Sequence, residues 1–425
     1  MKQLQVITLA VLSLLPFSAQ ADSFKKIRPH LDTDGTFLAY ADFRGDGQKI
    51  AETLHEIYAD LVVSQPLLAM VQLDFNALFN TLGLGSIHAI GTSSKQLKEG
   101  VYANRSALLL QEGKPLGFFE SFGNPDSKTF PFTAAKLAPA DASVAISFLF
   151  QIDSFRKTIV ELLGQTMGPM GETLIESQLS QNIPSTEVTY GAAIQALSGK
   201  WDLFWHESVS DGFNTTYKVW LRITGAADIV QQLKPLATNL PITLRELEDG
   251  IHADLSELLP FADSRLFIET SAKNDTLTLY THQDWGAESA GPRLNESENF
   301  QKLAAFLPKK ALSYSYSDAY DFLPVLQEFI QASPDLAPYS AAIEKTFDLF
   351  VGDFLKPAVS VAYFDKGTYV TDCYAAYSNK QLTLLLPAAF IGGVGVAAAI
   401  PILETFETIP LPSTGSGGAR SRKSL

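Results

Sequence analysis

The sequence predicts a segregated α+β fold, built from repeated strand–helix–meander units with antiparallel sheets and helices on one face. Short segments with apolar residues at every second position run into Asp or Ser, and apolar residues at helical spacing follow. Between these units lie strand-rich stretches with hairpin turn signals, such as Asp365-Lys366-Gly367. Such meanders favour antiparallel sheets with segregated helices, and a C-terminal transmembrane helix completes the predicted architecture.

The N-terminal segment has the three parts of an export signal. Lys2 precedes an apolar stretch from Val6 to Phe17, and the small residues Ala19 and Ala21 follow it. We therefore expect residues 1–21 to be a signal peptide that is cleaved after Ala21. The alternatives are an uncleaved anchor and a buried N-terminal helix.

Six apolar segments then precede amphipathic patterns and define the strand–helix units: 37–42, 70–74, 144–153, 219–224, 251–254 and 312–318. Most of them end in an aspartate, and together these residues could suggest an acidic site: Asp42, Asp74, Asp153, Asp254 and Asp318. Helix capping explains them better, because an Asp oxygen at this position accepts a hydrogen bond from a free backbone N–H of the new helix.

Loop-rich stretches near 124–141 and 286–299 divide the body into three α+β repeat regions, 22–140, 141–298 and 299–380. Between residues 30 and 378 the layout resembles exported bacterial proteins of unknown function that are built from degenerate strand–helix repeats. That resemblance implies an envelope location.

Composition excludes several functional classes. The net charge of −14 argues against nucleic-acid binding, which requires a basic face. The single cysteine, Cys373, cannot form an internal disulfide, and such scarcity suits a bacterial periplasm. The six histidines are scattered without metal-ligand spacing, so we expect no metal and no cofactor.

One set of short motifs suggests catalysis. Ser154-Phe-Arg-Lys157, Ser317-Asp-Ala319 and Lys366-Gly-Thr368 resemble, in that order, the three elements of penicillin-binding proteins and serine β-lactamases. The resemblance implies a serine acyl-transfer enzyme with Ser154 as nucleophile and Lys157 tuning its proton transfers. Ala319 replaces the amide of the second element, and the third element is reversed, so this remains the alternative function.

Aromatic residues concentrate between 201 and 220, where Trp201, Trp205 and Trp220 are candidate ligand-binding residues. They could form an aromatic surface for a peptide, a glycan or a lipid. The simpler interpretation is the core of a sheet. A carrier of hydrophobic ligands is a further alternative.

The run from Leu382 to Leu403 contains no charged residue and would be about 33 Å long as a helix, enough to cross a bilayer. Ala389, Gly393 and Ala397 recur every four residues and would allow a partner helix to approach closely. Residues 393–401 resemble the membrane segment of type IV pilins, which supports a helical span. The alternative is a helix or strand pair buried in the fold.

The flexible tail 404–425 ends in basic residues and predicts an outside-to-inside orientation of the span. Together these features predict an exported binding or scaffold protein without catalytic activity. It would be tethered to the bacterial inner membrane by its C-terminal helix, with the main body in the periplasm.

Overall fold

The computed structural model describes residues 22–383 except 71–72, 115, 211–213, 234, 236–241, 259–264, 283–290, 319–326, 329, 334–336, 338–339, 348–351 and 382. The expected signal peptide, the apolar run beyond Thr383 and the basic tail lie outside the described residues. Among the residues that are described, no helix combines the length and the hydropathy that a bilayer span requires.

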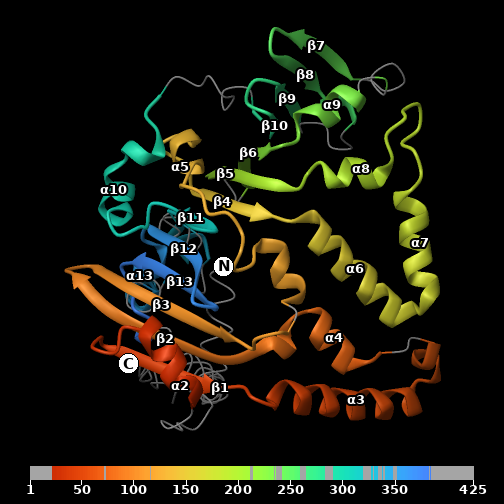
Figure 1. The fold of residues 1–425 in the computed structure, drawn as a ribbon. Helices are drawn as coiled ribbons and strands as arrows, with labels where there is room; N and C mark the ends of the chain where they lie inside the picture. Colours follow the sequence, from red (N-terminus) through yellow and green to blue (C-terminus); the bar gives the residue numbers. More distant parts are fainter. Residues whose placement is uncertain are drawn as a thin grey trace, which may run out of the picture.

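The sheet confirms the mixed α+β class and the antiparallel pairing. Its 13 strands follow the order β1-β2-β3-β13-β12-β11-β4-β5-β6-β10-β9-β8-β7, and each pairs antiparallel with its neighbours (Figure 1). The strands are β1 (Phe37–Asp42), β2 (Ile87–Lys98), β3 (Val101–Leu110), β4 (Val144–Phe150), β5 (Gly199–Ser210), β6 (Asn214–Thr224), β7 (Thr243–Leu247), β8 (Gly250–Asp254), β9 (Phe267–Ser271), β10 (Thr276–Tyr280), β11 (Ser313–Ser317), β12 (Ala358–Asp365) and β13 (Thr368–Ala375).

Three neighbouring triplets of strands share one order along the chain. In β1-β2-β3, β4-β5-β6 and β11-β12-β13, a strand is followed by a helical segment and then by two strands that pair as a hairpin. The triplet β11-β12-β13 lies between the other two, joined through β3·β13 and β11·β4. The three sequence regions therefore share one sheet, and the last region is inserted between the first two.

Six of the helices fall into two groups. The helices α3, α4, α6 and α7 extend beyond the ends of the strands and contact one another, whereas α5 and α10 lie close to the strands (Figure 1). The helices are α2 (Asp22–Ile27), α3 (Asp46–Ser64), α4 (Phe75–Thr81), α5 (Ala134–Leu137), α6 (Ile152–Met167), α7 (Pro169–Leu179), α8 (Tyr190–Gln195), α9 (Ala227–Leu233), α10 (Glu298–Ala304), α12 (Ser340–Phe347) and α13 (Asp353–Leu355).

One face of the sheet carries a continuous apolar row. Its members pair directly across strands, so their side chains project from the same face. They run from β3 to β9 and are all buried: Ala103, Tyr374, Val359, Tyr316, Ala145, Phe204, Trp220, Tyr280 and Phe267. Helices α5 and α10 cover this row with small and apolar side chains.

The expectation of helices on one face needs correction. Phe300 of α10 packs in the cluster that contains Tyr374, whereas Phe354 of α13 packs in the cluster that contains Cys373. Successive strand residues point to opposite faces, so α10 and α13 cover opposite sides of β13. The physical reason is that β13 buries its side chains on both faces over Asp372–Ala375.

Of the aspartates expected to cap helices, Asp74 does so, Asp42 does not, and Asp153 lies inside α6, after the first helical residue Ile152. Asp74 caps α4 by accepting a hydrogen bond from the backbone N–H of Ala77 at 3.0 Å. Asp42 instead pairs with Arg44, and Gly45 in the left-handed conformation precedes α3. Glycine adopts this left-handed conformation without the steric cost that a Cβ would add.

Candidate functional site

A polar row lies beside the apolar row on the same face of the sheet. On each shared strand, this row lies two residues from the apolar row. Its members pair directly across strands from β2 to β7: Ser93, Arg105, Asp372, Val361, Tyr314, Ser147, Asp202, Arg222, Thr278, Glu269, His252 and Arg245. Charged side chains at inward positions of a sheet require partners, because an unpaired buried charge is costly. The row contains two such paired clusters.

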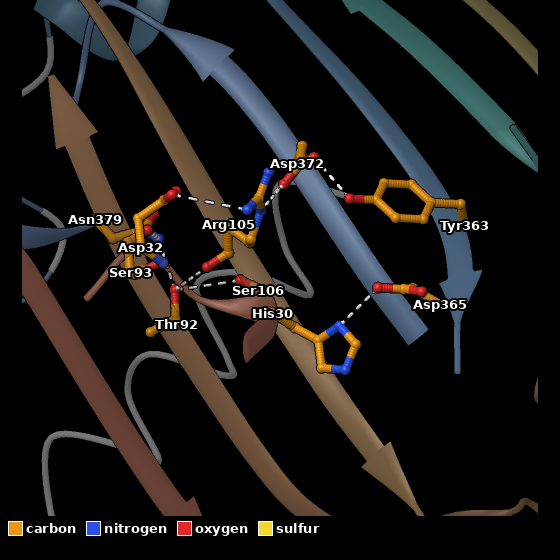
Figure 2. A network of polar contacts seen from close by, with 10 residues as sticks. All are labelled: His30, Asp32, Thr92, Ser93, Arg105, Ser106, Tyr363, Asp365, Asp372 and Asn379. Carbon is orange, nitrogen blue, oxygen red and sulfur yellow. Dashed lines mark hydrogen bonds and ion pairs between the residues drawn. The ribbon is translucent and has the colours of Figure 1, made fainter. Parts of the chain in front are cut away.

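The first cluster joins β3 to β13 (Figure 2). Arg105 forms a forked pair with Asp372, with Nε 2.5 Å from Oδ1 and Nη2 3.2 Å from Oδ2. The Tyr363 hydroxyl donates to Asp372 Oδ2 at 3.1 Å, and Arg105 Nη1 lies 3.7 Å from Asp32 Oδ1. A bidentate arginine–carboxylate pair fixes both distance and orientation, so this contact aligns the two strands.

The Arg105 guanidinium stays positively charged in this cluster. Burial alone would lower the pKa of the Arg105 guanidinium, but the hydrogen bonds and charge of Asp372 outweigh it, and the pKa is raised. Burial, assisted by the charge of Asp372, raises the pKa of the Tyr363 hydroxyl. Arg105 is therefore a permanent cation, and Tyr363 is a neutral donor across the ordinary pH range.

The segment after α2 also contacts this cluster. The backbone N–H of Asp32 donates to Ser93 Oγ at 2.9 Å, and His30 Nδ1 lies 3.1 Å from Asp365 Oδ2. Ile27 is fully buried against the first strands. The N-terminal part of the described chain is thus held to β2 and to the β12–β13 hairpin.

On the other face of β2 and β3, the chain after β13 is anchored by a buried asparagine. Asn379 Nδ2 donates to Thr92 Oγ1 at 2.7 Å (Figure 2). Its backbone N–H donates to Ser94 Oγ at 2.8 Å and to Asn104 Oδ1 at 3.0 Å. Asn104 in turn donates from Nδ2 to the carbonyl of Tyr377 at 2.8 Å. All four polar side chains are buried, so these hydrogen bonds replace lost contacts with water.

A helix begins at this anchor. Asn379, Lys380 and Gln381 are helical, and the backbone N–H of Ser378 donates to Gln381 Oε1 at 2.7 Å. Ser-x-x-Gln is the sequence pattern of a capping box, and the bond from the Ser378 N–H to the Gln381 side chain is one of the two hydrogen bonds of that motif. Gln381 Nε2 also donates to Asp353 Oδ2 at 3.0 Å, which ties the new helix to α13. We name the polar contacts of Asn379, Thr92, Ser94, Asn104 and Gln381 the C-terminal anchor.

The second charged cluster lies where α5 meets β4, β5 and β6. The fully buried Asp202 receives Arg222 Nη2 at 2.6 Å, Lys200 Nζ at 3.2 Å and Ser147 Oγ at 2.6 Å. Thr133 also donates to Asp202 and accepts from Lys200. Burial alone would raise the pKa of Asp202, but Lys200 and these hydrogen bonds lower it. The carboxylate is saturated with donors, which suits a structural role.

The tryptophans predicted to bind a ligand do not form one site. Trp220 is buried in the apolar row and stacks on Phe204 with ring centroids 4.5 Å apart. Trp201 belongs to the opposite face, where it packs against Phe148 and Phe150. Trp205 shares the face of Trp201, because the two positions are four apart on β5.

The residues of the acyl-transfer alternative lie on α6 and on separate strands. Ser154 is in the first turn of α6, and Thr158 Oγ1 donates to its carbonyl at 2.9 Å. The Lys157 side chain is 78% exposed and lies 3.9 Å from Glu161. Ser317 ends β11, and Lys366 occupies the β12–β13 turn.

Sequence reasoning missed the residues that the structure brings together: Asp32, Arg105, Asp202, Arg222, Asp372 and Asn379. The available signal was a charged residue at an inward position of an alternating strand, as at Arg105 and Asp202. Within the described part of the chain, no group of three or more His, Cys, Asp or Glu side chains is placed to hold a metal ion. Comparison with protein-family models, with curated proteins and with solved structures gave no match.

Proposed function

We propose that this protein is exported and acts as a binding or scaffold protein tethered to a membrane by the run Leu382–Leu403. The C-terminal anchor is the observation that carries the proposal. A helix starts at Asn379, and Leu382, the first residue of the apolar run, follows three positions later in the sequence. Because Asn379 is buried and hydrogen-bonded to β2 and β3, the start of this helix has a defined place on the sheet.

The absence of a linker has a mechanical consequence for such a tether. Only Lys380 and Gln381 separate Asn379 from Leu382, and a helix rises about 4.5 Å between these two positions. The sheet would therefore sit against the bilayer with a limited range of orientations. The small residues Ala389, Gly393 and Ala397 would offer a surface for pairing with another membrane helix.

The export half of the proposal comes from the sequence. Residues 1–21 have the pattern of a cleaved signal peptide, and cleavage after Ala21 would leave α2 at the mature N-terminus. Cys373, the one cysteine, is buried, so the protein carries no exposed thiol into an oxidising compartment. The body would lie in the periplasm of a bacterium, on the outer side of the inner membrane.

We also infer that the three strand–helix–hairpin triplets are diverged repeats of one unit. Each contributes three adjacent strands, and the units join edge to edge by antiparallel pairing. Edge-to-edge addition protects the free edges of each unit and produces the long sheet. Such a sheet provides an extended scaffold for binding surfaces.

Binding is favoured over acyl transfer by the surroundings of the expected catalytic pair. The ammonium of Lys157 is mostly solvated and pairs with Glu161, whereas a lysine that activates a nucleophile lies in a desolvated pocket or beside another cation. In the second cluster, the fully buried Asp202 pairs with Lys200. Both side chains also form hydrogen bonds with hydroxyl groups.

The experiment compares the full-length chain with a truncation that ends at Gln381, both expressed in a bacterium with the signal segment. We expect the full-length protein to stay with carbonate-washed inner membranes, and the truncation to be released with the periplasmic fraction. Mass spectrometry should find Asp22 at the mature N-terminus. Release of the full-length protein would disprove tethering, and loss of cooperative unfolding in the truncation would show that the run belongs to the core.

A further inference from the structure

Helix α3 packs on only part of its apolar surface. Tyr58 contacts Phe75 of α4 with ring centroids 5.9 Å apart and donates its hydroxyl to the Leu68 carbonyl at 2.7 Å. Ala51 is buried on the same side. Most of the large apolar side chains that are exposed in the described part of the chain lie on α3 and on the segments around α6–α8.

The uncovered part of α3 is an ordered apolar stripe. Ile50, Leu54, Ile57 and Leu61 follow at intervals of four, three and four residues, and Ile50, Ile57 and Leu61 are 47%, 50% and 46% exposed. Alternation of three and four is the seam of a coiled coil, in which each side chain enters a hole on a facing helix. The stripe extends about 16 Å, or three helical turns. We call these four residues the α3 seam.

Acidic residues border the α3 seam on the side away from α4. At 100° per residue, Asp46, Lys49 and Asp60 flank the seam on the side opposite to Ala51 and Tyr58. Lys49 Nζ lies 3.7 Å from Asp46 Oδ1, so this flank carries one net negative charge. The helix carries four acidic residues, Asp46, Glu52, Glu56 and Asp60, against one lysine, Lys49. In a coiled coil, residues that flank the seam select the charge of the partner.

We propose that the α3 seam binds an amphipathic helix of a partner protein, at least three turns long, with Lys or Arg beside its apolar face. This inference rests on the proposed binding function and gives it a surface and a partner class. A second copy of α3 would bring like charges together, and an anionic lipid surface would meet the same repulsion. The helix already extends beyond the sheet, where a partner helix can lie alongside it (Figure 1).

The test measures binding of two synthetic helical peptides to the body that ends at Gln381. Both have Leu at the two seam positions of three heptads; one has Lys at the flanking positions, and the other has Glu. We expect the Lys peptide to bind with an affinity that falls as salt increases, and the Glu peptide to bind at least tenfold more weakly.

Two protein variants and a control locate the site. The double substitution Ile57→Ser and Leu61→Ser should lower the affinity for the Lys peptide at least tenfold. Leu97→Ser, at an exposed apolar residue of β2, should leave this affinity unchanged. Asp60→Lys should lower the affinity for the Lys peptide and raise the affinity for the Glu peptide. Unfolding of the protein cannot produce such a reversal. Thermal unfolding midpoints establish that the exposed substitutions preserve the fold.

Three outcomes would overturn the inference. They are equal binding of both peptides, equal loss with Leu97→Ser, and a dimer or a complex with phosphatidylglycerol vesicles that depends on Ile57. None of these outcomes bears on membrane fractionation, because the tested protein lacks residues 382–425. The peptide experiments and the membrane fractionation therefore test the α3 seam and the membrane tether separately.

Discussion

Asn379 donates its side-chain amide to the hydroxyl of Thr92 at 2.7 Å, across 287 positions of sequence. This bond and its neighbours hold the chain after the last strand against the second strand. A buried polar group that loses its partner retains the cost of desolvation without compensation. The anchor is therefore both a stabilising contact and the start of the proposed tether.

Replacing Asn379 by Ala removes the bond to Thr92 and leaves the buried hydroxyl without this donor. We expect a loss of about 1–3 kcal/mol in the free energy of unfolding. Urea denaturation of the body ending at Gln381 measures it. Asn76→Ala, at an exposed position of α4, is the control and should change little; equal effects would mean that the anchor contributes no stability.

Removing one partner of the Arg105–Asp372 pair should lower the free energy of unfolding more than replacing both partners with apolar residues. Asp372→Ala leaves the Arg105 guanidinium and the Tyr363 hydroxyl without their acceptor, and we expect a loss of about 3–5 kcal/mol. The double variant Arg105→Met with Asp372→Leu should recover part of this loss. A double-mutant cycle from denaturation curves quantifies the coupling, and additive losses would contradict the pairing.

Acid should destabilise the protein in part through Asp202. The folded-state pKa of Asp202 is lowered below 3.8, so its contribution is present above about pH 4 and is lost as the pH falls through the lower folded value. Burial lowers the pKa of Lys200. The pH dependence of stability that this shift causes lies between the folded-state pKa of Lys200 and the ordinary lysine pKa of 10.5, and it does not contribute between pH 2 and 6. Denaturation midpoints between pH 2 and 6 should show a smaller acid loss in Asp202→Asn.

Three buried tyrosines should resist ionisation until the fold opens. Burial raises the pKa of Tyr280, Tyr314 and Tyr374 to about 12 each, from an ordinary value of 10. Neutral tyrosine is thus favoured by folding, and this stability is lost as the pH rises from about 10 through 12. Ultraviolet difference titration should show delayed ionisation in the native protein and a single transition near pH 10 in urea.

The α6–α7 hairpin depends on a missing side chain. A Cβ at Gly171 would lie 2.5 Å from the carbonyl oxygen of Leu163, which is backbone and cannot turn away. Gly171→Ala should therefore destabilise the protein by about 1–3 kcal/mol and increase hydrogen exchange in α6 and α7. Gly291→Ala, where no atom lies within 4 Å, is the matched control.

Local patterns predicted most of the local structure, but the strand expected over 70–74 was wrong, because Met70 ends a 3-10 helix and Asp74 caps α4. Period-two segments such as Phe37–Asp42 and Val144–Phe150 are strands, and the turn at Asp365-Lys366-Gly367 joins β12 to β13. The same reasoning treated Trp201, Trp205 and Trp220 together, whereas they project from two faces of the sheet. Sequence proximity cannot separate the faces of neighbouring strands until their register is known.

By itself, the sequence determined the α+β class and the antiparallel pairing, because alternation of apolar residues and turn chemistry act over a few residues. Only the tertiary structure decided that the last three strands lie between the first and second triplets. It alone also placed Arg105 opposite Asp372 and Asn379 beside Thr92. These pairings join residues more than 260 positions apart, and they depend on which strand edges remain free after each hairpin has formed.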